Sequence, residues 1–240
     1  MFNRFLKPEV RYARRMARIK RWDAPLEGRW ARVRAYANML FVDHGVFRAL
    51  YLNRHRVTHR FWRAAQPSPR DIDAIARLGV RTVVNLRGGR EYGSWPLERD
   101  ACRRNGLTLA EFVVRSREAP SRETILAAKR FFETVEYPVL VHCKSGADRA
   151  GFMAALHLVL QEGRSVDEAA AQLSLRYGHF RFAKTGILDA FFALYKQEGE
   201  AAGLDFMTWV SEVYEPDRLR ARFRPSFWSA LLVDRVLHRE

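Results

Sequence analysis

The stretch from Tyr137 to Gly151, YPVLVHCKSGADRAG, decides the fold of this 240-residue chain. Its first five residues are apolar and β-rich, which predicts a short buried strand marked by a proline. Residues 152–160 predict an apolar helix, so residues 142–151 form a loop between a strand and a helix N-terminus. At such a junction, unpaired backbone N–H groups and the helix dipole favour an anion. The loop is therefore predicted to bind a phosphate dianion.

The side chains of this loop suit chemistry on a phosphate monoester. Cys143 ends the strand and faces the amides, where a helix N-terminus and nearby cations stabilise a nucleophilic thiolate. Arg149 can bind two phosphoryl oxygens with its planar guanidinium, Gly146 lets the backbone turn, and His142 is expected to hydrogen-bond to the loop backbone. The predicted reaction is attack of the sulfur on phosphorus, giving a phosphocysteine that water hydrolyses. The predicted substrate-binding residues of the loop are His142, Lys144, Ser145, Gly146 and Ala147.

The pattern His-Cys-x-x-Gly-x-x-Arg in this setting resembles the phosphate loop of cysteine-dependent protein tyrosine and dual-specificity phosphatases, most closely the bacterial dual-specificity branch. Residues 61–68 are similar to the opening strand of those domains, and residues 79–87 to the helix-to-strand unit that follows. The resemblance covers residues 61–215. It implies a compact α/β domain, with a small, mainly parallel sheet that carries the loop at its carboxyl edge and has helices on both sides.

Two positions depart from the pattern of that family. The residue after the arginine, usually a serine or threonine that helps the cysteine to leave, is Ala150, so the intermediate is expected to hydrolyse slowly. Family members also bring a general acid, an aspartate, from a separate loop, but the corresponding residues 113–120 contain none. Glu118 is one candidate for the acid, and Asp148, placed as in the myotubularin-type lipid phosphatases, is the other. The alternatives are a solvated charge for Glu118 and a structural partner of Arg149 or of a backbone amide for Asp148.

The segment after the phosphate loop holds two further candidates. Residues 165–176 predict a helix that is interrupted by Gly178, and in the resembled family this region faces the pocket. Arg176 and His179 are therefore candidate substrate-binding residues, with a purely structural role as the alternative.

Positive charge is concentrated at the two ends of the chain. The formal net charge is +15, of which residues 1–63 carry +12, the last 24 residues +3 and the residues between them none. We predict a basic helical N-terminal extension over residues 1–60, the phosphatase domain over residues 61–215 and a basic tail over residues 216–240. Residues 29–52 have apolar side chains at helical spacing and are expected to pack as a helical hairpin on the domain.

A helix is predicted to begin near Pro8, with arginines on one face and apolar residues on the other. The basic face comprises Arg11, Arg14, Arg15, Arg18 and Arg21, and the apolar face comprises Tyr12, Met16 and Ile19. Such a helix can lie on an anionic membrane surface, and the alternative is a solvated face whose apolar stripe packs on the domain. Nucleic acid is not an expected partner, because no base-reading motif accompanies the charge.

Together these features predict a phosphatase that acts on phosphate monoesters without a metal or cofactor. The basic helix and Lys144 favour a membrane lipid or glycolipid phosphate, of the lipid A or phosphoinositide kind. The alternatives are a protein tyrosine or dual-specificity phosphatase acting on phosphoproteins and, because of Ala150 and the missing aspartate, a phosphate-binding pseudophosphatase. Two cysteines, no signal peptide and no membrane-spanning stretch predict a cytoplasmic protein, peripheral at the inner membrane face if the helix binds lipid.

Overall fold

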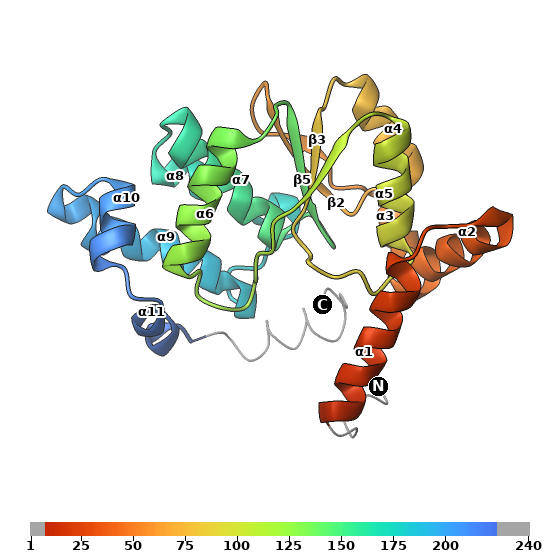
Figure 1. Cartoon of the computed structure of the whole chain (residues 1–240). Helices are drawn as coiled ribbons and strands as arrows, with labels where there is room; N and C mark the ends of the chain where they lie inside the picture. Colours follow the sequence, from red (N-terminus) through yellow and green to blue (C-terminus); the bar gives the residue numbers. More distant parts are fainter. Residues whose placement is uncertain (1–7, 225–240) are drawn as a thin grey trace.

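The computed structural model describes residues 8–224 of the chain (Figure 1). The predicted basic ends also include residues 1–7 and 225–240, which lie outside the described residues. The strands are β1 (His55–Arg56), β2 (Phe61–Ala65), β3 (Thr82–Asn85), β4 (Thr108–Glu111) and β5 (Val139–Cys143). The longer helices are α1 (Pro8–Asp23), α2 (Gly28–Ala37), α4 (Pro69–Arg77), α5 (Ser94–Arg104), α6 (Arg122–Thr134), α7 (Asp148–Glu162) and α9 (Ile187–Glu198). The shorter helical segments are η2 (Asn38–Val42), α3 (Gly45–Leu50), α8 (Val166–Ala170), η3 (Leu175–Tyr177), η4 (Lys184–Gly186), η5 (Glu200–Ala202), α10 (Phe206–Thr208), η6 (Trp209–Val213) and α11 (Pro216–Arg222).

β5 lies at the centre of a five-stranded sheet with the order β1-β2-β5-β3-β4. It pairs in parallel with β2 and with β3, β4 pairs in parallel with β3, and β1 pairs antiparallel with β2. The register places Cys143 opposite Ala65 of β2 and His142 opposite Asn85 of β3, so these three strands end at the same edge. The loop that follows β5 therefore leaves from the middle of the carboxyl edge, where open parallel sheets bind their ligands.

Alternate residues of β5 face two different layers of helices. Val139, Val141 and Cys143 belong to the larger core with residues of α6, α7 and α9, whereas Leu140 packs with residues of α4 and α5. Both faces of the sheet are therefore covered, which explains why this strand shows no simple alternation of apolar and polar residues. The predicted α/β fold, with a mainly parallel sheet and helices on both sides, is confirmed (Figure 1).

The elements predicted around the loop are present with shifted bounds. β5 ends two residues later than predicted, and α7 begins at Asp148, four residues earlier than predicted. The helix predicted for residues 165–176 is wrong beyond Ala170, where α8 ends. The chain turns here, and the carbonyl of Gln172 accepts a hydrogen bond from the Arg63 side chain in place of a helical partner.

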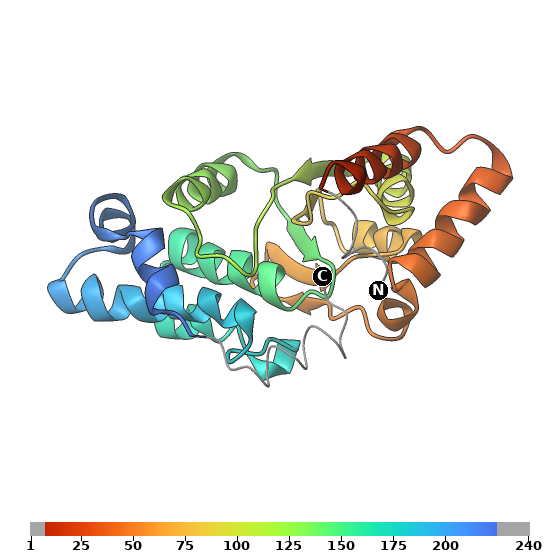
Figure 2. The same ribbon diagram turned by 90° about the horizontal axis from the view of Figure 1, so that it is seen from below.

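The N-terminal helices pack against α5 and reach beyond the edge of the sheet (Figure 1, Figure 2). Ala35 of α2 and Met39 of η2 form a small core with Leu97 of α5. Gly93 makes this close approach possible, because a Cβ there would lie 2.3 Å from the carbonyl oxygen of Ala35. The predicted basic helix is present as α1. Within residues 8–224, no helix combines the length and the apolar character that crossing a membrane requires.

Candidate active site

The nucleophile candidate lies on the floor of the loop between β5 and α7. Cys143 is almost fully buried, and the backbone N–H of Gly146 donates a hydrogen bond to its Sγ at 3.2 Å. The first turn of α7 begins five residues after the cysteine, so the positive end of its dipole lies at the same loop. The sulfur thus lies beside a loop amide and at the positive end of a helix dipole, the position that the sequence pattern predicts for a nucleophile.

Four carbonyl groups of the loop are held by residues outside it. Those of residues 144–147 accept hydrogen bonds from the backbone N–H of Gln66 (3.4 Å), Asn53 Nδ2 (3.0 Å) and Arg63 Nη2 (2.7 and 2.9 Å). In a trans peptide the C=O and the following N–H point in opposite directions. Because the carbonyls point outward, the N–H groups of the loop face its inside, where a phosphate would sit.

Arg63 is the main brace of the loop and was not among the predicted site residues. It is fully buried in β2, and its Nη1 also donates to the carbonyl of Gln172 at 2.6 Å. Its guanidinium carbon lies 4.0 Å from the ring centroid of Tyr177. Burial lowers the pKa of Arg63 to about 10, so the side chain is still charged at neutral pH. The signal in the sequence is an arginine inside a strand of otherwise mostly apolar residues.

His142 contacts a buried glutamate rather than the loop or the cleft. Its side chain is fully buried, and Nε2 lies 2.5 Å from Oε1 of Glu98 in α5. Glu98 Oε2 accepts a hydrogen bond from Asn85 Nδ2 at 2.9 Å. Burial alone would raise the pKa of Glu98, but the charge and hydrogen bond of His142 lower it. The predicted role of His142 in substrate binding is corrected accordingly, because period-two alternation turns its ring to the α5 side of the sheet.

Asp148 and His179 form a buried pair. Asp148 Oδ1 lies 2.7 Å from His179 Nδ1, and His179 Nε2 lies 2.5 Å from Oδ2 of Asp189 in α9. Burial alone would lower the pKa of His179, but the two carboxylates raise it to about 9, so the imidazole is charged at neutral pH. His179 is enclosed and cannot contact a substrate as predicted; it ties the start of α7 to α9.

The loop opens into a cleft of about 510 Å³. Its lining includes two acidic residues, Glu91 and Glu118. It also includes six cationic residues, Arg15, Arg87, Arg115, Arg117, Lys144 and Arg149. Burial lowers the pKa of Lys144, and the charges of nearby arginines lower it further, against the opposing charge of Asp43.

The predicted site residues therefore differ in where they lie relative to the cleft. Arg149, Lys144 and Glu118 line the cleft, whereas Asp148 and His179 lie beside it. Ser145, Gly146 and Ala147 contribute backbone groups to the loop, as described for residues 144–147. The side chain of Arg176 is exposed on η3, packs against Tyr177 and does not line the cleft.

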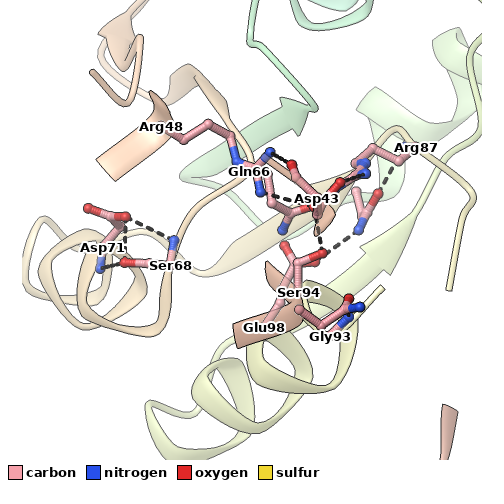
Figure 3. Close-up of polar contacts among 11 residues, drawn as sticks. Asp43, Arg48, Gln66, Ser68, Asp71, Arg87, Gly93, Ser94 and Glu98 are labelled. Atoms are coloured by element: carbon pink, nitrogen blue, oxygen red, sulfur yellow. Dashed lines mark hydrogen bonds and ion pairs between the residues drawn. The ribbon is translucent and has the colours of Figure 1, made fainter. Parts of the chain in front are cut away.

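The buried carboxylate of Asp43, in the N-terminal segment, gathers several hydrogen-bond donors around it (Figure 3). Asp43 accepts hydrogen bonds from Arg87 at 2.7 and 2.8 Å, and from Arg48 and Ser94 at 2.9 Å. Burial alone would raise the pKa of Asp43, but the hydrogen bonds and charge of Arg87, with the charge of Arg48, lower it. Because Arg87 also lines the cleft, the segment before β1 helps to build the site. The charge pattern of the sequence did not indicate this role.

Comparison with known proteins places the chain in a family. Residues 33–187 match the family described as PTP-NADK, DSP-PTPase phosphatase fused to NAD+ kinase. Over 118 residues the chain is 35% identical to the beta-lactamase hydrolase-like protein of Xylella fastidiosa, covering 48% of this chain and 27% of that protein. Over 129 residues it is 28% identical to the dual specificity protein phosphatase TpbA of Pseudomonas aeruginosa, covering 54% of this chain and 56% of that protein. The chain thus matches about a quarter and about half of the lengths of these relatives.

The likeness extends to the fold and includes the loop. The crystal structure of P. aeruginosa TpbA aligns with a TM-score of 0.51 at 19% identity, over 71% of this chain and 89% of that chain. The family match begins inside α2 and contains every loop residue from Cys143 to Arg149. It covers well over half of the chain. The protein therefore belongs to the PTP-NADK family of DSP-PTPase phosphatases, within the cysteine-dependent superfamily that its phosphate loop predicts.

Proposed function

We propose that this protein hydrolyses phosphate monoesters through a cysteinyl-phosphate. The observation that supports this most strongly is the loop itself, with Cys143 Sγ at its floor and the carbonyls of residues 144–147 turned outward. The thiolate attacks phosphorus, the bond to the leaving oxygen breaks, and a general acid protonates that oxygen. Arg149 and the loop amides hold the phosphoryl oxygens while charge redistributes. Water then attacks the phosphocysteine, which releases phosphate and restores the thiolate.

Glu118 is the better-placed candidate for the general acid. It lines the cleft and pairs with Arg115 at 3.1 Å, and its side chain is half exposed and therefore able to exchange protons with solvent. Asp148 is held by His179, which favours the structural alternative for this residue. Either carboxyl would have to be protonated at the moment of transfer.

Substrates with poor and good leaving groups should distinguish the roles of these two carboxyl groups. Glu118→Gln is expected to lower kcat for phenyl phosphate by about 100-fold and to affect para-nitrophenyl phosphate much less, because a good leaving group needs little protonation. Asp148→Asn is expected to lower both rates equally and to lower the melting temperature, because it weakens the bridge to His179. Glu133→Gln, an exposed change on α6, is the matched control. A larger leaving-group effect from Asp148→Asn than from Glu118→Gln would reverse the assignment.

The second prediction concerns Ala150, which is fully buried in the first turn of α7. Without a hydroxyl at this position, the second step is expected to limit the rate, so rapid mixing with para-nitrophenyl phosphate should show a burst followed by slow turnover. Ala150→Ser is expected to raise the steady-state rate about tenfold and to shrink the burst. Phosphate binding with neither burst nor turnover in both proteins would instead support the pseudophosphatase alternative.

For the substrate, we propose a lipid or glycolipid phosphate at an anionic membrane. The support is the open cationic cleft together with apolar side chains exposed on the neighbouring N-terminal helices. Trp30 and Phe41 are 74% and 72% exposed, and Tyr12 and Met16 on α1 are exposed as well. Of the predicted apolar stripe of α1, Tyr12 and Met16 are exposed and Ile19 is half-buried, which weakens the alternative of a solvated face whose apolar stripe packs on the domain. Amphipathic aromatic and basic residues together suit a lipid interface. This proposal places the protein in the cytoplasm, peripheral at the inner membrane face.

Co-sedimentation with vesicles tests the membrane part of this proposal. Wild type is expected to bind vesicles of phosphatidylcholine with phosphatidylglycerol, and Trp30→Ser with Phe41→Ser to bind them much more weakly. Leu78→Ser removes an exposed apolar side chain at the end of α4 and is expected to bind like wild type. Equal binding by all three proteins would remove these helices from the proposal.

A phosphoprotein substrate is the second candidate, and the name of the relative TpbA, a dual specificity protein phosphatase, favours it. Initial rates with a panel of phospholipids, sugar phosphates and phosphotyrosine peptides distinguish the two. A kcat/KM that is highest for the peptides, and unchanged by vesicles, would favour phosphoproteins over lipids.

A further inference from the structure

Positive charge extends through the cleft well beyond the phosphate loop. Both acidic residues of the cleft are already paired, Glu118 with Arg115 at 3.1 Å and Glu91 with two arginines of α1. Arg149 and the loop amides suffice for the reacting phosphoryl group. Arg87 is likewise paired with the buried Asp43, so the six cationic residues of the cleft face three carboxylates. The net positive charge that remains is larger than the single charge of Arg149, and a recessed site concentrates its potential.

Arg15 brings part of this charge from the N-terminal end of the chain. Its Nε donates to Oε1 of Glu91 at 2.6 Å, and its side chain is about half exposed in the cleft. Its two terminal nitrogens make no hydrogen bond to any part of the chain that the structure describes. The hydrogen bond from Nε thus orients the side chain, and the two terminal nitrogens remain available to donate hydrogen bonds to the oxygens of an anion.

α1 is held in place by contacts on two sides, so Arg15 is positioned before any ligand arrives. Arg18 Nη2 contacts Oε2 of the same Glu91 at 3.2 Å. At the end of α1, Asp23 accepts a hydrogen bond from Trp95 Nε1 at 3.0 Å, and its backbone carbonyl accepts one from Arg99 at 2.7 Å. A preorganised donor loses less entropy on binding than a free one.

We propose that Arg15 and the neighbouring cations of the cleft form a binding site for a second anionic group of the substrate. The inference rests on the proposed function and sharpens it: the preferred substrate is a phosphate monoester that also carries a second phosphate, as a monoester or a diester. Such a group occurs both in soluble bisphosphates and in lipid headgroups. α1 thereby acts as a specificity element and not only as a membrane contact.

Binding to Cys143→Ser, measured by calorimetry, tests this without requiring turnover. Glucose 1,6-bisphosphate is expected to bind about tenfold more tightly than glucose 6-phosphate, since one well-placed charged pair accounts for a difference of this size. Adding Arg15→Gln is expected to remove most of that preference, and Arg15→Lys to remove part of it. Arg14→Gln, an exposed change on the same helix that does not line the cleft, is the matched control and should retain the preference.

A second pair of ligands tests whether the second phosphate belongs to a soluble bisphosphate or to a lipid headgroup. Dioctanoyl phosphatidylinositol 4-phosphate is compared with dioctanoyl phosphatidic acid, which has a single phosphate. A preference for the two-phosphate ligand that depends on Arg15, in either pair, supports the site. The pair with the larger preference indicates whether the substrate is a soluble bisphosphate or a lipid. The proposed site would be overturned if neither pair of ligands showed a preference. It would also be overturned if Arg15→Gln weakened the binding of the one-phosphate and the two-phosphate ligand by the same factor. A preference without any turnover by wild type would leave the site standing and remove the hydrolase proposal instead.

Discussion

Replacing Cys143 by serine is expected to abolish turnover of para-nitrophenyl phosphate, with a fall in kcat of at least about 10,000-fold. A serine hydroxyl stays protonated at neutral pH and is a far weaker nucleophile than a thiolate. The oxygen occupies nearly the same position as Sγ, which accepts the Gly146 N–H at 3.2 Å, so the loop should keep its shape. Phosphate binding should therefore persist while the chemistry is lost, and steady-state kinetics with calorimetry measures both.

Cys102→Ala is the matched control for this change. The Cys102 thiol is buried in the core between α4, α5 and the sheet, on the opposite side from Cys143, and burial raises its pKa. It is thus an inert side chain, and its loss is expected to change kcat by no more than about twofold. Residual turnover by Cys143→Ser, or an equal loss in both variants, would exclude the covalent route through Cys143.

Gly146→Ala is expected to reduce kcat by about 100-fold, because a small displacement of a reacting group has effects of this size. Gly146 has a φ of +74°, and a Cβ there would lie 2.6 Å from the backbone nitrogen of Ala65 and 2.7 Å from the carbonyl carbon of Ala64. These are backbone atoms of β2, which is paired on both sides, so the loop must move instead. The amide that contacts Sγ would move with it.

Gly163→Ala is the matched control, because it introduces the strain of a positive φ without a steric clash like that between a Cβ at Gly146 and the backbone of β2. Gly163 ends α7 with a similar φ of +61°, but a Cβ there would meet nothing within 4 Å. Its replacement should lower the free energy of unfolding by about 1 kcal/mol through strain alone and leave kcat near that of wild type. If both variants lose activity equally, or if neither does, the close approach of Gly146 to β2 has no role in shaping the loop.

The sequence predicts the reactive part of the site well, because that part is contiguous. Cys143 and Arg149 lie within seven residues of one another, and a strand, a loop and a helix follow in order. Local propensity and the helix dipole therefore suffice to predict an anion-binding loop with a nucleophile. The family resemblance, confirmed by the match over residues 33–187, rests on the same local pattern.

The supports of the loop could not be predicted, because they come from distant parts of the chain. Arg63 and Asn53 hold loop carbonyls that lie more than 80 residues further on, and Asp43 reaches Arg87 across 44 residues. Each is a polar residue whose partner becomes adjacent only when the strands pair. Composition and periodicity carry no information on such pairs.

The sequence by itself determined the chemistry of the loop and the α/β class, since both follow from short-range order in the chain. Only the tertiary structure decided which charges serve the site. Because side chains alternate along β5, His142 faces Glu98 and not the cleft. His179 is enclosed between two carboxylates. Arg15 reaches the cleft because α1 packs on α5. The physical reason is that a side chain's role depends on burial and on its partners, and both are set by contacts between segments far apart in the sequence.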